Sequence, residues 1–147
     1  MKMTTPSFMK PGIIILCLSC INCATETTLP QNNKPLANTQ WRLTFYADQS
    51  GKITNINVAD FYKIKFLDTM LIGFDNCNDI SATYKVSNGS TLRFGDFTST
   101  LKLCSENIEF LGALSHSNYY EFPQSTLSIV TTLPDLHRLY FVADTGR

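Results

Sequence analysis

The chain has 147 residues, the size of a single domain, and a hydrophobic fraction of 44%, which is ordinary for a globular protein. Charged residues make up only 16%, and Thr, Ser and Asn are prominent among the rest, a composition that suits an extracytoplasmic β-rich protein. The net charge is zero overall and −2 from Cys20 onward (ten basic and twelve acidic residues), so no basic surplus is available to bind nucleic acid.

Residues 1–19 have the pattern of a secretory signal peptide. Lys2 and Lys10 provide a positively charged start, and the apolar run 13–18 follows them. That run is far shorter than the roughly 20 residues that a membrane-spanning helix needs. The segment therefore predicts export rather than a transmembrane anchor.

The Leu18-Ser19-Cys20 ending resembles a bacterial lipobox, in which a small residue precedes a lipidated cysteine. It departs from that pattern at Cys17, which stands where Leu is usual. We predict lipidation of Cys20; cleavage near Ala24 and an uncleaved anchor are the alternatives. A lipid-anchored protein of the cell envelope, on the periplasmic or outer-membrane side, is the predicted location.

Residues 20–36 are predicted to be a flexible tether, because they carry two prolines and many small polar residues without periodicity. The folded domain then extends over 37–147. Cys23 lies within the tether and has no predicted partner in the domain.

The first strands of the domain follow from alternation of apolar and polar residues. Residues 41–46 predict a strand with Trp41, Leu43 and Phe45 facing the core. A turn at 48–52 and a weaker strand at 53–58 follow it.

Residues 61–67 give a clearer strand, in which Tyr62, Ile64 and Phe66 face the core. Lys63 and Lys65 lie on the opposite face of this strand and are predicted to be solvated.

The stretch from Asp75 to Cys104 predicts the central hairpin. Residues 80–86 alternate most regularly, and Asn88-Gly89 supplies the positive φ angles of a two-residue type I′ turn. The partner strand is predicted at 91–94, and the chain then continues over 97–104 toward the second cysteine.

One helix is predicted after Cys104. Ser105 is a candidate N-cap, Glu106 suits the N-terminal dipole, and an apolar stripe runs to residue 114. Three further strands are predicted at 119–122, 127–130 and 139–142. The expected fold is mainly β with one helix: a small antiparallel, barrel-like curled sheet of seven or eight strands.

These residues resemble the META/HslJ domain family over roughly 36–142. The resemblance rests on Trp-x-Leu at Trp41, on a Cys-Asn pair with a following Tyr, and on a Thr separated by three residues from a second Cys. The matching motif residues are Trp41, Cys77, Asn78, Tyr84, Thr100 and Cys104. Asn76 departs from the pattern, because Gly is common there.

The resemblance implies a β-fold in an envelope or secreted protein, sometimes linked to heat or antibiotic stress. It implies no established catalytic set and no cofactor. The function therefore stays open in chemical terms.

Cys77 and Cys104 flank the hairpin, and in an oxidising compartment a disulfide between them is the leading prediction. Two buried free thiols, or a reactive or metal-binding pair, are the alternatives.

A catalytic or metal site finds little support in the pattern. A zinc site from Cys77, Cys104, His116 and His137 would lack the close ligand pair that such sites use. A Cys104–His116 nucleophile lacks a supporting motif, and the acidic stretch 75–79 lacks the glycine of an EF-hand. We expect no metal, no catalytic residues and no nucleic-acid partner.

The leading functional hypothesis is a lipid-anchored, non-enzymatic domain that binds a protein or small ligand and contacts the membrane through its anchor. An exposed apolar patch or an open barrel mouth would favour it. A structural or inhibitor-like interaction domain is the alternative, which a protruding loop would favour. An enzyme ranks third.

Overall fold

The computed structural model describes residues 35–56, 62–103 and 108–145. The predicted signal peptide, Cys20, Cys23 and all but the last residues of the tether lie outside this part of the chain. The described elements are β1 (Thr39–Ala47), β2 (Ile53–Asn55), β3 (Tyr62–Phe66), β4 (Met70–Asp75), β5 (Asp79–Ser87), β6 (Thr91–Phe94), β7 (Thr98–Ser99), α1 (Phe110–Ser115), β8 (Ser117–Glu121), β9 (Thr126–Thr131) and β10 (Arg138–Ala143).

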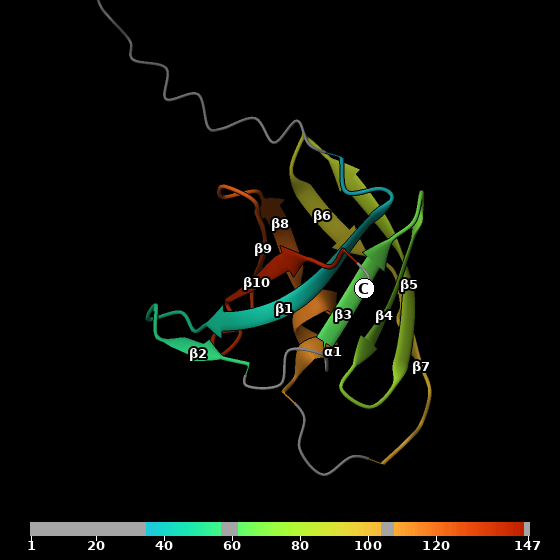
Figure 1. Cartoon of the computed structure of the whole chain (residues 1–147), viewed down its shortest axis with the longest axis horizontal. Coiled ribbons are helices and arrows are strands. Elements are labelled where there is room, and N and C mark those ends of the chain that lie inside the picture. Colours follow the sequence, from blue (N-terminus) through green and yellow to red (C-terminus); the bar gives the residue numbers. More distant parts are fainter. Residues whose placement is uncertain (1–34, 57–61, 104–107, 146–147) are drawn as a thin grey trace, which may run out of the picture.

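The strands form a closed antiparallel barrel. Their order is β10-β9-β8-β6-β5-β4-β3-β1, and β1 also pairs with β10, which closes a ring of eight strands. Strand β2 extends the sheet beyond β1, and β7 pairs with β5 beside the ring (Figure 1). The prediction of a small antiparallel, barrel-like sheet with one helix is confirmed.

The first strand corrects one predicted orientation. Trp41 and Leu43 are buried as expected, but Phe45 is only half-buried and stacks on Tyr140 with ring centroids 4.3 Å apart. The pairing of β1 with β10 shifts register between Leu43 and Phe45. This irregularity adds a residue to one strand, so Phe45 pairs with Tyr140 on the outer face. The prediction that Phe45 faces the core is therefore wrong.

The alternation predicted for β3 is confirmed, with Tyr62, Ile64 and Phe66 buried beneath a more exposed pair of lysines. In the β5–β6 hairpin, Asn88 and Gly89 have φ angles of 50° and 76°, as a primed turn requires. Ser87 pairs with Thr91, so three residues rather than two connect the strands.

Strands β6 and β8 meet at a single pair, Thr91 with Tyr119. The side chain of Arg93 reinforces this joint by donating hydrogen bonds to the carbonyl oxygens of Ser117 and Asn118. The Arg93 side chain thus adds hydrogen bonds between β6 and β8, whose backbones pair at one position only.

The helix is shorter than predicted and begins at Phe110. Glu109 occupies the N-cap position without a side-chain hydrogen bond, while the predicted Ser105 cap and Glu106 lie outside the described residues. Phe110 fills the barrel interior, with ring centroids 5.1 Å from Tyr62 and 6.3 Å from Phe141. Figure 1 shows α1 behind β1 and β3, toward the lower end of the barrel.

One predicted strand is shorter in the structure, and a further short strand follows β6. The weak strand at 53–58 is reduced to β2, whose three residues are exposed, and its last two residues lie outside the described part. Within the described residues 97–103, the chain forms the two-residue strand β7. Neither segment carries the buried alternation that would hold a longer strand against the core. The last three strands agree with their predicted positions to within a few residues.

Candidate functional site

The hairpin between β4 and β5 is closed by hydrogen bonds of its own residues. The buried carboxylate of Asp75 accepts from the backbone N–H groups of Cys77 and Asn78, at 3.3 and 2.7 Å. Asn76 has a φ angle of 80°, a left-handed conformation that asparagine tolerates better than most residues. Asparagine can therefore replace the glycine that is common at this position. The side chain of Asp75 stabilises the turn by hydrogen bonds to its backbone.

Asn78 holds the chain around β7 against this hairpin. Its Oδ1 accepts from the hydroxyl of Thr100 at 3.0 Å and from the N–H of Lys102 at 2.8 Å. The N–H of Asp79 donates to the Thr100 hydroxyl at 3.1 Å. We call Asn78, Thr100 and Lys102 the Asn78 clamp.

Cys77 lies beside the same clamp, with its Sγ 3.6 Å from the carbonyl oxygen of Lys102. The clamp therefore brings Lys102, which lies two residues before Cys104 in the sequence, close to Cys77. Cys104 itself lies outside the described residues, and the disulfide stays a prediction.

The two remaining motif residues are also structural. The Tyr84 hydroxyl donates to the carbonyl oxygen of Leu67 at 2.6 Å, and burial, with a smaller contribution from the charge of Asp68, raises the pKa of Tyr84. Trp41 is 1% exposed and donates from Nε1 to the hydroxyl of Thr39 at 2.7 Å. The described motif residues thus hold the barrel together and do not converge on a cavity.

A cavity lies instead on the outer face of the barrel, over β1, β3, β4, β5 and β7, with a volume of about 670 Å³. Strand register places its outward side chains in two rows that cross the strands. The first row is Gln40, Lys65, Ile72, Ser81 and Thr98, and the second is Lys63, Phe74, Asp79 and Thr100. We call this feature the outer groove.

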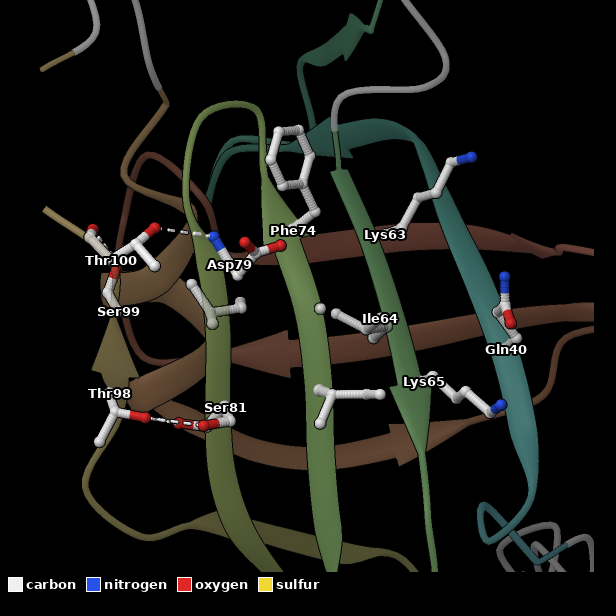
Figure 2. Close-up of a pocket in the computed structure, with 13 residues that line it drawn as sticks. Gln40, Lys63, Ile64, Lys65, Phe74, Asp79, Ser81, Thr98, Ser99 and Thr100 are labelled. Carbon is white, nitrogen blue, oxygen red and sulfur yellow. Dashed lines mark hydrogen bonds between the residues drawn. The ribbon is translucent and has the colours of Figure 1, made fainter. Parts of the chain in front are cut away.

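The chemistry of the outer groove changes from one side to the other. Figure 2 shows Lys63 and Lys65 on the β3 side, Phe74 on β4, and the hydroxyl side chains on the β5–β7 side. Ile72, which is 40% exposed, contributes to the floor together with Phe74. The groove therefore has a cationic side, an apolar centre and a hydroxyl-rich side that also carries Asp79.

The two lysines differ in their surroundings. Lys63 Nζ lies 3.7 Å from a carboxylate oxygen of Asp144, which also accepts from Gln40 Nε2 at 3.0 Å. Lys65 is exposed and makes no ion pair with the described residues. Lys65 is thus the groove's cation whose charge is not already balanced within the described part of the protein.

The hydroxyl-rich side is held by its own contacts. Ser81 Oγ lies 2.7 Å from Thr98 Oγ1, and Ser99 Oγ donates to the Thr100 carbonyl oxygen at 3.0 Å. Beneath the groove, Gly73 leaves little space, because a Cβ there would lie 2.4 Å from the carbonyl oxygen of Lys63. These contacts hold apolar, hydroxyl and cationic side chains side by side on one surface.

The structure separates the histidines considered for chemistry from the groove. His116 Nδ1 lies 2.8 Å from the carbonyl oxygen of Gly112, and neither His116 nor His137 lines the cavity. Over the described ranges, no three His, Cys, Asp or Glu side chains gather as metal ligands would. Likewise, no helix in the described part has the length and apolarity to cross a bilayer.

Sequence reasoning did not find the groove. The signal available was the pair Ile72 and Phe74, two apolar side chains two residues apart on the face opposite the buried Leu71. Lys63 and Lys65 were predicted to form a solvated face; Lys65 is exposed and Lys63 partly exposed, as predicted, and both also border the groove. Only the pairing of β3 with β4 brings these residues together.

Comparison with known proteins gives a family and a fold. The NMR structure of a protein from Burkholderia xenovorans is similar at a TM-score of 0.61 and 23% identity, over 76% of this chain and 85% of that one. The crystal structure of a DUF4847 family protein from Bacteroides vulgatus has a TM-score of 0.59 at 18% identity, over 76% and 96% of the respective chains.

At such identities the two structures show the shared fold alone. None of the curated proteins matches the chain. The META domain, however, matches residues 34–145, which include every described strand and α1. The chain belongs to the META domain family.

Proposed function

We propose that the protein is a lipid-anchored binding domain of the cell envelope, without enzymatic activity, that holds its ligand in the outer groove. The single observation that carries this proposal is the groove itself. Its volume of about 670 Å³ lies within the usual range of ligand sites, and its apolar floor is bordered by a few polar groups.

The barrel interior offers no competing site in the described structure, because large side chains fill it. Trp41, Phe66, Phe110 and Phe141 are each no more than 1% exposed. A binding function was expected to show either an exposed apolar patch or an open barrel mouth. The feature that supports it here is the outer groove, because large side chains fill the barrel interior. The filled interior supports a binding surface outside the ring.

The composition of the groove supports binding over catalysis. Its hydroxyls at Ser81 and Thr98 contact each other, and no histidine or cysteine is among its lining residues. A nucleophile with an adjacent base, the arrangement that covalent catalysis uses, is therefore not offered by these side chains.

The anchor is tested by metabolic labelling with a radioactive or clickable fatty acid in a host that processes lipoproteins. The chain is expected to carry label, and Cys20→Ala is expected to abolish it. Cys23→Ala is the matched control and should keep the label. Labelling of the Cys20→Ala variant at the unchanged level would contradict the anchor.

The groove is tested by site-directed photo-crosslinking in intact cells. A photoreactive phenylalanine analogue replaces Ile72 in the floor, and a control places it at Val86, which is similarly exposed at 37% but does not line the groove. An adduct is expected from position 72 and not from position 86. Equal adducts from both positions, or none from position 72, would count against a groove ligand.

One observation favours the alternative of an inhibitor-like interaction domain. Leu101 and Leu103 are fully exposed, and the clamp fixes the backbone of Lys102 between them. A protruding apolar segment of this kind suits insertion into a partner protein. The same photoreactive residue at position 101 separates the two functions, because this alternative expects the adduct there and not at position 72.

A further inference from the structure

We infer that the ligand of the outer groove is a small amphipathic anion, whose oxyanion meets Lys65 and whose apolar body lies on Ile72 and Phe74. This inference rests on the proposed function and adds the chemical class of the ligand. It is carried by the order of the side chains across the strands.

The charge of the groove favours an anion on the β3 side. Asp144 already balances Lys63 at 3.7 Å, whereas Lys65 makes no ion pair with the described residues. Lys65 pairs in register with both Gln40 and Ile72, so its neighbours in that row are an amide and an apolar side chain. A carboxylate, sulfonate or phosphate at this end would gain a cation. The Gln40 amide already donates from Nε2 to Asp144 at 3.0 Å, and its second N–H is the donor that could reach the anion.

The centre of the groove favours an apolar body. Ile72 exposes 40% of its surface, and Phe74 on the same strand is also incompletely buried. Covering these side chains removes apolar surface from water, which is the main favourable contribution to binding of small ligands. Neighbouring strands lie about 4.8 Å apart, so the body has about 10 Å to cover between β3 and β5.

The far side of the groove sets the orientation. Asp79 pairs with Phe74 in register, and the hydroxyls of Ser81 and Thr98 lie in the neighbouring row. A second anionic group at this end would meet a carboxylate and be repelled, whereas a neutral hydrogen-bonding group would meet hydroxyls. The ligand is therefore charged at the β3 end only.

Two fluorescent probes with the same aromatic frame test the charge requirement. Anilinonaphthalene sulfonate carries one oxyanion, and N-phenylnaphthylamine lacks it. Both are titrated into the exported full chain carrying Cys20→Ala, purified without detergent. We expect the sulfonate to bind at least about fivefold more tightly than the neutral probe at low salt, and this margin to shrink as salt is raised.

Two pairs of variants assign that binding to the groove. Lys65→Gln is expected to weaken the sulfonate about fivefold and to leave the neutral probe within about twofold, with Lys85→Gln as the control outside the groove. Ile72→Ser is expected to weaken both probes about fivefold, with Val86→Ser as its control. Thermal unfolding of each variant confirms that it is folded.

The outcomes separate this inference from the proposed function. If Ile72→Ser weakens both probes but Lys65→Gln changes neither, the groove binds ligands and the anionic class is wrong. If neither variant changes either probe, or the wild-type domain binds neither, both the ligand class and the groove as a site are overturned. The inference is supported if Lys65→Gln weakens binding of the sulfonate but not of the neutral probe, and Ile72→Ser weakens binding of both probes.

Discussion

The Asn78 clamp and the outer groove lie next to each other, share Thr100, and differ in what their side chains contact. In the clamp, Asn78 Oδ1 accepts two hydrogen bonds from the protein itself. In the groove, Ile72 leaves 40% of its surface to solvent and Lys65 makes no ion pair within the described residues. Apart from Thr100, which belongs to both, the motif residues stabilise the fold and residues outside the motif line the proposed binding surface.

This contrast has a measurable form. Changes in the clamp and its surroundings should lower the free energy of unfolding and leave probe binding by the folded protein unchanged. Changes at Lys65 or Ile72 should weaken probe binding and leave the free energy of unfolding nearly unchanged. The following substitutions challenge this division, from the largest expected effect on stability to the smallest.

Replacing Cys77 and Cys104 together by Ser should lower the free energy of unfolding by about 3 to 4 kcal/mol, because the predicted disulfide closes a loop of moderate length. Urea unfolding of the oxidised protein and the double variant measures this loss. Wild type treated with a reductant should reproduce it. Alkylation of both thiols in the untreated folded protein, identified by mass spectrometry, would show that the disulfide is absent.

Gly73→Ala should lower the free energy of unfolding by about 2 to 3 kcal/mol, since the new Cβ would lie 2.4 Å from the Lys63 carbonyl oxygen. The strain also moves β3 relative to β4 beneath the groove, so this variant alone should weaken both stability and probe binding.

Gly95→Ala is the matched control for Gly73→Ala. Its Cβ would meet the Thr83 hydroxyl at 2.5 Å, a side-chain atom that can rotate away, and a smaller loss of stability follows. Equal losses at the two positions would show that backbone crowding at Gly73 is not the cause.

Asn78→Ala should cost about 2 kcal/mol, because two hydrogen bonds to Oδ1 are lost and the Lys102 N–H is left without its acceptor. Chemical denaturation of this variant beside Lys65→Gln provides the comparison, and Lys65→Gln should unfold at the wild-type denaturant concentration. If the Asn78→Ala protein kept its stability but no longer bound the sulfonate probe, Asn78 would act in ligand binding and not in stabilising the fold.

Tyr84→Phe should cost about 1 kcal/mol at neutral pH, the contribution of the hydrogen bond from its hydroxyl to Leu67. Burial raises the pKa of Tyr84, so the folded state favours the neutral phenol. That contribution is fully present below the unfolded pKa of about 10 and is lost as the pH rises through the raised folded pKa. Unfolding curves of wild type and variant should therefore converge at alkaline pH, and a constant gap would contradict this assignment.

Much of the fold was accessible from local patterns. The alternation of Tyr62, Ile64 and Phe66 predicted the buried face of β3, because side chains on a strand point to opposite sides in turn. The Asn88-Gly89 pair predicted its turn, since few other residues accept two successive positive φ angles. Both predictions depended on neighbours in sequence, and the strand face and the two positive φ angles were right, but the predicted two-residue connection was wrong, because three residues join the strands.

Predictions failed where a distant partner decides the local conformation. Phe45 continues the alternation of Trp41 and Leu43, but the register shift against β10 turns it to the outer face beside Tyr140. The helix begins at Phe110, where the barrel interior receives that side chain, and not at the best capping residue. Packing against residues far along the chain outweighed local preference in both cases.

The sequence by itself determined the mainly-β class, the inward faces of most strands and the family with its motif residues Asn78 and Thr100, because periodicity, turn chemistry and motif spacing are local properties. Only the tertiary structure decided the closure of the ring and the outer groove. The groove unites residues from five strands, and its hydrogen bond from Gln40 to Asp144 spans 104 positions of the chain. No local pattern records such a contact, since it exists only after β1 has paired with both β3 and β10.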